Sequence, residues 1–203
     1  GLMVILFLSR SFSSMPMFIS TAQTLGYFES ILSSKANIFS ILLASILFPM
    51  FLATVRVIAL FIFSYLFDSD YLNFFSLIEI LVVLIFSSIP FVGISLAICS
   101  VIIIYKRANF INSLFLLGCS IFSGIFYPIN VMPSVFQNLS LVFPSTYSVN
   151  LVRGRIIEDL SYLDMIGDIL SIFFISIAYL SIGIYLIYYS IKLVKKNGSI
   201  SHY

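Results

Sequence analysis

The side chains that most often act in catalysis or bind metal ions are scarce in this sequence. The single histidine, His202, lies one residue from the end of the chain, which leaves no histidine-centred catalytic or metal site. Cys99 and Cys119 each lie within an apolar run, as small core residues do, and indicate neither a disulfide framework nor a metal site. No G-x-x-x-x-G-K-[ST] loop for binding phosphates occurs. The sequence therefore predicts no catalytic residue, no metal site and no cofactor bound by this chain.

Two charged residues within apolar runs indicate a different chemistry. Arg56 is flanked by long apolar stretches, and an arginine at the middle of a membrane costs about 2.5–3.5 kcal/mol to insert. Such residues usually face a bundle interior or a wet cavity. Arg56 has two interpretations: it snorkels or pairs with an acid that holds helices together, or it makes a polar contact along a translocation path. Glu79, near the start of its own apolar run, is expected to be structural.

The composition places these residues in a membrane protein. Only 9% of the 203 residues are charged and 61% are hydrophobic, whereas soluble domains are about a quarter charged. A soluble fold of this size has more surface than so few charges can keep hydrated. The net charge of +2 is small and its basic residues are scattered, which excludes the clustered basic face of a nucleic-acid-binding protein. The solvent for most of the chain is therefore lipid.

Five apolar runs predict helices that cross the bilayer. A hydrocarbon core of about 30 Å needs about 20 helical residues. The alternating pattern of a membrane β-barrel is absent. The predicted fold class is an all-α polytopic helical bundle, one transmembrane domain over residues 1–203, with about five spans at residues 1–21, 38–67, 74–105, 110–127 and 169–191.

The first run, residues 1–21, differs from the others. It begins without an initiator methionine and is interrupted by Arg10 and a serine-rich stretch. A signal peptide would carry its basic residues before the apolar core and a small-residue cleavage site after it. The run is therefore interpreted as a truncated or partial span whose upstream sequence is missing from this chain.

The basic residues predict which ends of the spans face the cytoplasm. Positive charges concentrate in short cytoplasmic loops. If residues 22–37 are cytoplasmic, the same side also carries the turn after residue 105 and the tail 192–203, and it holds six basic residues: Lys35, Lys106, Arg107, Lys192, Lys195 and Lys196. The opposite side holds Arg153 and Arg155, outnumbered by acids. The sequence thus predicts a cytoplasmic C-terminus.

The cytoplasmic segment, residues 22–37, has the pattern of a short amphipathic helix. Its apolar residues fall on one face at helical spacing, and they are Leu25, Phe28, Ile31 and Leu32. Two interpretations stay open at this point. The helix lies on the membrane surface, or it docks a cytoplasmic partner.

The outer segment, residues 128–168, is unlike an ordinary loop. It contains Pro128, Pro133 and Pro144, yet it stays largely apolar between them. Apolar stretches of about ten residues are too short to span a membrane. They predict helices that dip into the outer leaflet and return, which is permitted only where protein or water satisfies the interrupted backbone.

This outer segment resembles the hallmark region of ABC-2-type transporter permeases. The family pattern is a glycine, two aromatic residues, a proline, a second proline shortly afterwards, and then Pro-x-Thr-Tyr or His followed by an arginine. The matching residues are Gly124, Phe126, Tyr127, Pro128, Pro133, Pro144, Thr146, Tyr147 and Arg153.

A second motif resembles the same family. Residues Gly26-Tyr27-Phe28-Glu29, followed by Leu32, are similar to the Gly-Thr-Leu-Glu element that forms the family's cytoplasmic coupling helix. Tyr27 replaces the usual threonine, and Lys35 stands where proline is common. The resemblance covers nearly the whole chain in order.

The resemblance implies the membrane-spanning permease subunit of an ATP-driven ABC exporter. The cargo would be amphipathic, such as a drug, a lipid-linked glycan or a polysaccharide. ATP and Mg would bind a separate nucleotide-binding ATPase subunit, and a second permease copy would complete a homodimer or a dimer of close paralogues in the plasma membrane. The family has six spans, so a chain with five lacks the first.

The resemblance also implies roles for individual residues. By this resemblance, the residues that couple the permease to the ATPase are Gly26, Tyr27, Phe28, Glu29 and Leu32. The residues that form an outer re-entrant gate are, by the same resemblance, Gly124, Phe126, Tyr127, Pro128, Pro133, Pro144, Thr146 and Tyr147. Arg56 keeps its place as a candidate residue of the translocation path.

Two other functions are alternatives to the permease. A membrane-embedded enzyme needs convergent acids or histidines inside the spans, and apart from Glu79 and Arg56 the spans offer almost none. A secondary transporter that runs on an ion gradient predicts intramembrane carboxylates, or broken helices in matched halves. No inverted repeat is visible in the sequence.

Overall fold

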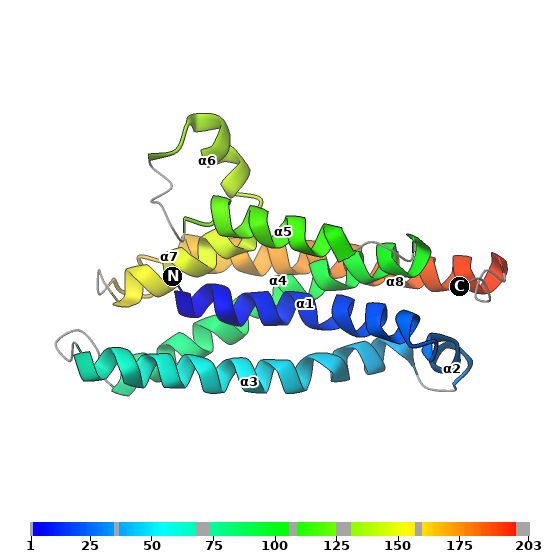
Figure 1. Ribbon diagram of the computed structural model, residues 1–203. Coiled ribbons are helices and arrows are strands. Elements are labelled where there is room, and N and C mark those ends of the chain that lie inside the picture. Colours follow the sequence, from blue (N-terminus) through cyan, green and yellow to red (C-terminus); the bar gives the residue numbers. More distant parts are fainter. Residues whose placement is uncertain are drawn as a thin grey trace.

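Long α-helices run side by side along one axis in the computed structural model (Figure 1). The structure describes residues 2–34, 37–67, 74–105, 109–124, 131–156 and 160–197, and these contain no β-strand. Eight helices follow one another within them: α1 (Leu2–Thr24), α2 (Phe28–Ser33), α3 (Ile38–Phe67), α4 (Phe74–Tyr105), α5 (Asn109–Phe122), α6 (Ser134–Ser140), α7 (Pro144–Ile156) and α8 (Ile166–Asn197). The predicted all-α class is confirmed.

Four helices are long and apolar enough to cross a membrane. They supply the segments Met3–Thr24, Ile38–Leu66, Ser76–Tyr105 and Ile166–Val194, of which the shortest has 22 residues. At 1.5 Å per residue that is about 33 Å, enough for a hydrocarbon core of about 30 Å. The chain is a multi-pass membrane protein.

The first span is a continuous helix despite Arg10, Pro16 and its many serines. Its hydroxyl groups donate to carbonyl oxygens one turn earlier on the same helix. Ser11 Oγ lies 3.4 Å from the oxygen of Phe7, and Thr21 Oγ1 lies 2.8 Å from that of Met17. Because these bonds consume the hydroxyl donors inside the helix, the polar residues do not break it.

The full-length span predicted over residues 110–127 is not found. α5 ends at Phe122 after 14 residues, a length of about 21 Å that is too short to cross the core. Gly124, which follows it, has φ of +71°, a left-handed conformation that ends helices. Residues 125–130 lie outside the part of the chain that the structure describes. The last span, in contrast, is longer than the predicted 169–191.

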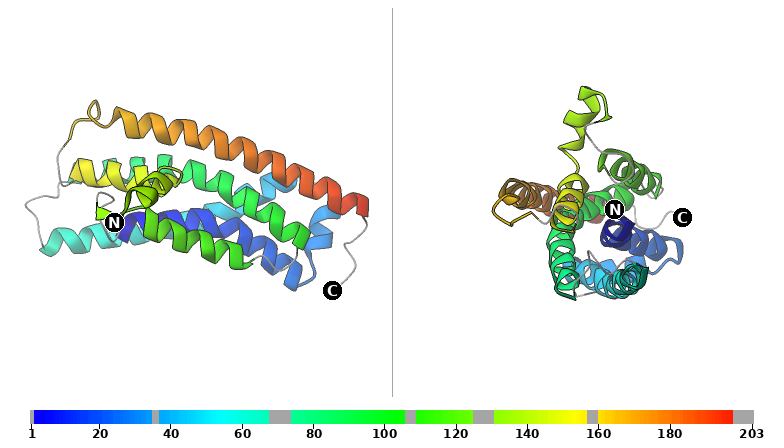
Figure 2. Two further views of the ribbon diagram at one scale, coloured as in Figure 1. Left: turned by 90° about the horizontal axis from the view of Figure 1, so that it is seen from above. Right: turned by 90° about the vertical axis from the view of Figure 1, so that its left-hand side faces the viewer.

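The bundle has two ends, which we name after the short helices found there. α2 lies with the C-terminal end of α8 at one end, the α2 end, and α7 lies near the start of α1 at the other, the α7 end (Figure 1). α6 projects away from the bundle, as the end-on view of Figure 2 shows. Each long helix runs from one end to the other.

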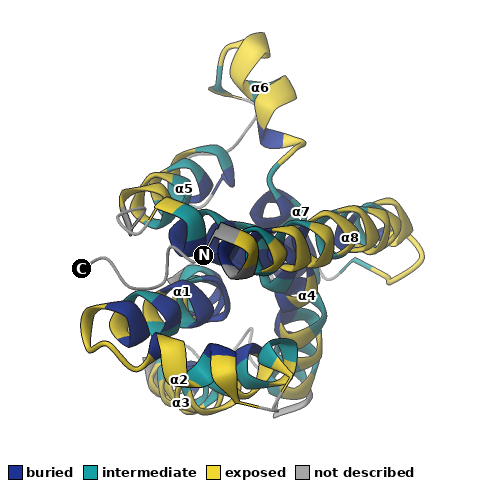
Figure 3. Cartoon of the chain, turned by 90° about the vertical axis from the view of Figure 1, so that its right-hand side faces the viewer, coloured by how far each residue is buried: buried dark blue, intermediate teal, exposed yellow. Residues whose placement is uncertain are grey.

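The side chains of α1 and α4 form the centre of the hydrophobic core. The largest fully buried side chains of α1 are Phe7, Phe12, Met15 and Ile19, and Phe12 packs edge-on against Phe91 of α4. Buried residues gather toward the middle of the bundle, whereas exposed residues line the outer sides of α3 and α8 (Figure 3). Since most of these exposed residues are apolar, lipid is the solvent that suits them.

α4 packs most extensively against α8. Glycines at the contact allow the two helix backbones to approach closely. A Cβ atom built on Gly183 would overlap the carbonyl oxygen of Gly93, and one built on Gly93 would overlap the backbone of Tyr179. Small residues let the backbones of membrane helices approach closely.

Candidate functional site

The α2 end carries the coupling motif, which begins with a sharp turn at Gly26. α1 ends at Thr24, and the N–H of Gly26 donates to the carbonyl oxygen of Gln23 at 3.3 Å. The φ angle of Gly26 is +77°, which a residue with a Cβ atom adopts only with strain. Glycine at this position therefore lets the chain leave α1 and enter α2 directly.

α2 has one buried side and one exposed side. Phe28 and Leu32 are buried, while Glu29, Ser30 and Ser33 are exposed. The predicted amphipathic helix is confirmed, but it has only six residues. Leu25 does not belong to its apolar face: it lies in the turn with 71% of its surface exposed. α2 thus presents a polar face at the α2 end of the bundle, with the half-exposed Tyr27 beside it.

The α7 end carries the proline-rich motif, and α7 is its central element. Pro144 is the first residue of α7, where its missing N–H costs no hydrogen bond. The next residues, Ser145, Thr146 and Ser148, are buried, although they are polar. α7 packs against α4 and α8. α7 is therefore a polar helix packed against two membrane spans at one end of the bundle.

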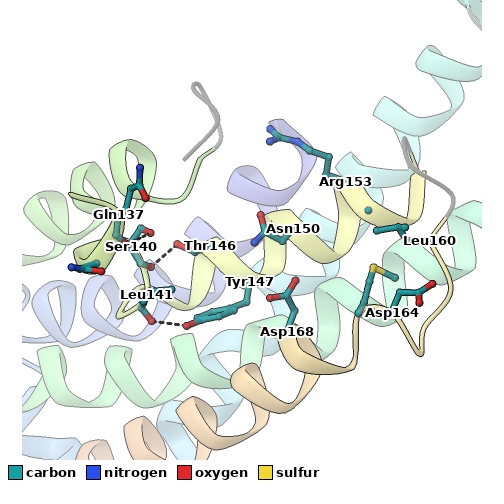
Figure 4. Close-up of a pocket in the computed structure, with 13 residues that line it drawn as sticks. Gln137, Ser140, Leu141, Thr146, Tyr147, Asn150, Arg153, Leu160, Asp164 and Asp168 are labelled. Carbon is teal, nitrogen blue, oxygen red and sulfur yellow. Dashed lines mark hydrogen bonds between the residues drawn. The ribbon is translucent and has the colours of Figure 1, made fainter. Parts of the chain in front are cut away.

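Thr146 and Tyr147 satisfy the backbone where the chain turns into α7. Thr146 Oγ1 donates to the carbonyl oxygen of Ser140 at 2.7 Å, and the hydroxyl of Tyr147 donates to that of Leu141 at 3.0 Å (Figure 4). Thr146 Oγ1 also lies 3.4 Å from the carbonyl oxygen of Phe122, at the end of α5. Unpaired carbonyls are costly in a membrane, so the Thr-Tyr pair stabilises the interruption between α6 and α7.

Arg153 joins the two ends of the motif. Its Nη2 donates to the carbonyl oxygen of Gly124 at 3.1 Å, across 29 residues of sequence. Thr146, Tyr147 and Arg153 thus each bond a backbone carbonyl of a preceding segment, and we call this set of bonds the α7 network. Pro133 lies apart, at the residue before α6. The motif residues Phe126, Tyr127 and Pro128 lie outside the described residues.

A polar cavity of about 570 Å³ opens beside this network. α6, α7 and the start of α8 line it (Figure 4). Its polar lining includes Gln137, Asn150, Asp164 and Asp168. Burial, and then the charge of Asp168, raises the pKa of the Tyr147 hydroxyl, so Tyr147 stays protonated and keeps donating to the backbone. The lining can bind a polar group, and it contains no nucleophile paired with a base.

An ion pair that the sequence did not reveal fastens α7 to α4. Arg155 Nε and Nη2 donate to Oε2 and Oε1 of Glu79, at 2.8 and 3.0 Å. The guanidinium also lies 5.3 Å from the centre of the Tyr162 ring. Glu79 thus has the structural role expected of it. A sequence signal existed, because an acid inside a span needs a partner, but nothing in the sequence selects Arg155 over Arg153.

Arg56 belongs to neither region. It lies on the exposed side of α3, next to the buried Val57, and no described residue forms an ion pair or a hydrogen bond with its side chain. The interpretation that it pairs with an acid to hold helices together finds no partner among the described residues. Within the same residues, no group of three or more His, Cys, Asp or Glu is placed to hold a metal ion.

Both regions fall within a match to a known family. The family model of the ABC-2 type transporter matches residues 1–157. The match runs from α1 through α7 and so includes the Gly26 turn and the network around Thr146. No curated protein matches the chain.

Proposed function

The chain belongs to the ABC-2 type transporter family and is a membrane permease component of an ABC transporter, and on this premise we propose that it exports an amphipathic cargo with energy from a separate ATPase subunit. The family component transports and is not itself catalytic. ATP and Mg would therefore bind the partner. The observation that carries the proposal is the combination of the family match with the exposed polar face of α2.

The ATPase docks on α2 in this proposal. Glu29, Ser30 and Ser33 face outward and are available to a partner, while Phe28 and Leu32 anchor the helix in the core. A displacement of α2 by the ATPase would be passed to α1 through this anchored side and through the tight turn at Gly26. The distribution of basic residues supports placing the α2 end in the cytoplasm.

The gate for cargo lies at the α7 end in this proposal. The polar helix α7 is held by side-chain bonds from Thr146, Tyr147 and Arg153 rather than by a continuous helix. Such bonds can be exchanged when neighbouring spans move. The cavity beside them supports an exit for a cargo with a polar group.

A second permease copy completes the path. α3 exposes a long apolar side and the charged Arg56, and an exposed arginine inside a span is expensive unless a cavity or a neighbour meets it. We place Arg56 on the translocation path, or at its border with the second copy. A homodimer or a pair of close paralogues in the plasma membrane would supply that neighbour.

Co-purification tests the proposal most directly. The tagged chain, extracted from its native membrane, is expected to carry a nucleotide-binding ATPase in equal amounts with it, and ATP hydrolysis by the complex should rise with cargo. Recovery of the folded chain without any ATPase, together with transport driven by an ion gradient alone, would overturn the proposal in favour of a secondary transporter.

A further inference from the structure

A second cavity, of about 510 Å³, lies between α1 and α3. Along α1 its lining runs from Arg10 to Thr21, roughly 16 Å at 1.5 Å per residue. Phe48 and Pro49 line it from α3, and Tyr27 lines it from the turn before α2. The cavity is therefore elongated, and it reaches from the middle of the spans to the α2 end.

Arg10 is the charged residue of this cavity. No acid lines it, and no described residue forms an ion pair or a hydrogen bond with the Arg10 guanidinium. Arg153 and Arg155, in contrast, are both bonded within the protein. A cation inside a span without a partner is costly to insert, and a bound anion would offset that cost.

Five residues of the lining carry hydroxyl groups, Ser13, Ser14, Thr21, Tyr27 and Ser45, and three of these groups already donate within their helices. Ser14 donates to the carbonyl oxygen of Arg10, Thr21 to that of Met17, and Ser45 to that of Leu42. Their hydrogens are consumed by the helix backbones. The Arg10 guanidinium is thus the group that would select for negative charge.

The rest of the lining is suited to an apolar chain. Met17, Phe18, Ile41 and Phe48 contribute aliphatic and aromatic surface along the length of the cavity. Met17 and Phe48 are largely exposed, at 68% and 69%, so no other described part of the chain covers them. An elongated apolar lining with a single cation suits a molecule that has one anionic head and one apolar chain.

We propose that the α1–α3 cavity binds an acidic amphiphile, with its anionic head on the Arg10 guanidinium and its apolar chain along Met17, Phe18 and Phe48. As an assignment of the cargo class, this rests on the proposed export function. The binding itself requires only that the chain spans a membrane. Contact with Tyr27 would make the bound molecule touch the coupling motif.

A tryptophan reporter can test the binding, because the chain contains no tryptophan. Phe48→Trp places a single fluorophore on the cavity. The full chain, reconstituted in vesicles of neutral lipid, is titrated with 9,10-dibromostearic acid in its ionised form and with 9,10-dibromostearyl alcohol. Both quench tryptophan through the same brominated chain, so only the head differs. The acid is expected to quench at a membrane concentration about fivefold lower than the alcohol needs, because one favourable charge contact provides a preference of about that size.

Matched variants separate the role of Arg10 from that of net charge. In the Phe48→Trp background, Arg10→Gln should abolish the preference for the acid, and Arg10→Lys should keep most of it. Lys192→Gln, which removes an exposed cation of α8 outside the cavity, should keep all of it. A reporter at Phe174→Trp, exposed on α8, should show no preference. Comparing variants cancels the different partition of acid and alcohol into the bilayer.

Two results would overturn the proposal. One is an unchanged preference in Arg10→Gln when circular dichroism shows intact helices. The other is an equal loss in Arg10→Gln and Lys192→Gln, which would assign the preference to net charge. The vesicle titration contains no ATPase, so either result leaves the permease proposal standing. Conversely, if co-purification finds no ATPase partner, a measured preference for the acid still holds.

Discussion

The carboxylate of Glu79 on α4 accepts two hydrogen bonds from the guanidinium of Arg155 on α7, at 2.8 and 3.0 Å. Residues 76 positions apart are joined in this way, and the pair holds the polar helix α7 to a membrane span. The contact is partly exposed, with 28% of the Arg155 side chain and 23% of the Glu79 side chain accessible.

Loss of this pair is expected to loosen the α7 end. Glu79→Gln should lower the free energy of unfolding by about 1.5–3 kcal/mol, because charge-assisted bidentate bonds are lost. The measurement is denaturant unfolding in detergent. A double-mutant cycle with Arg155→Gln should show strong coupling, since each change alone removes the same bonds. Additive effects of the two changes would contradict the pairing.

Reversal of the charge on α2 is expected to uncouple transport from ATP hydrolysis. Glu29→Lys leaves Phe28 and Leu32 buried, so membrane insertion and folding should be intact. Stimulation of the partner ATPase by cargo should fall by about tenfold or more, since like-charge juxtaposition at an interface costs several kcal/mol. Leu163→Lys, which introduces the same lysine at an exposed position of the α7 end outside the cavity, serves as the control. Equal effects of both variants would remove the docking assignment.

Removal of the Thr146 hydroxyl is expected to destabilise the interruption between α6 and α7. Thr146→Val keeps the volume but leaves the carbonyl of Ser140 without its 2.7 Å bond, and an unpaired buried group costs about 1–3 kcal/mol. Thr146→Ser retains the hydroxyl and should stay close to wild type. Thermal unfolding in detergent distinguishes them, and an equally stable Thr146→Val protein would show that the bond contributes nothing.

The contact between α4 and α8 is expected to depend on Gly183. Gly183→Ala should cost about 1–3 kcal/mol of stability, the usual penalty for overpacking, because its methyl group would overlap the backbone of Gly93. Gly167→Ala, at a site where a Cβ meets nothing within 4 Å, is the matched control in the same helix. Their unfolding midpoints in detergent should differ clearly, and coincident midpoints would refute the close approach.

Labelling of single cysteines is expected to reveal whether α6 lies in lipid. Val135 on α6 and Leu163 before α8 are both exposed in the isolated chain, at 66% and 78%, so only lipid can make them differ. With the re-entrant arrangement, a membrane-impermeant maleimide should modify Leu163→Cys and spare Val135→Cys. The buried Cys99 and Cys119 leave the parent chain as an unreactive control. Equal labelling would make the outer segment an ordinary exposed loop.

The features that could be predicted from the sequence are those set by the immediate solvent or by local backbone geometry. Apolar length predicted the spans of α1, α3, α4 and α8, because a bilayer demands about 20 apolar residues wherever they lie. The spacing of Phe28 and Leu32 predicted the buried side of α2. The gate role that the family motif assigns to Gly124, Thr146 and Tyr147 stays a prediction, and the structure shows that Thr146, Tyr147 and Arg153 each donate to a backbone carbonyl of a preceding segment.

Other features depended on the tertiary structure. Hydropathy extended the fourth run to residue 127, whereas the helix ends at Phe122 because Gly124 turns the backbone. Nothing local distinguishes Arg155, bonded to Glu79, from Arg153, bonded to Gly124, or marks Arg10 as the cation of a cavity. These outcomes depend on how each helix is rotated and how deep it lies against its neighbours. Lipid selects which residues enter the membrane, but only packing decides which of them meet.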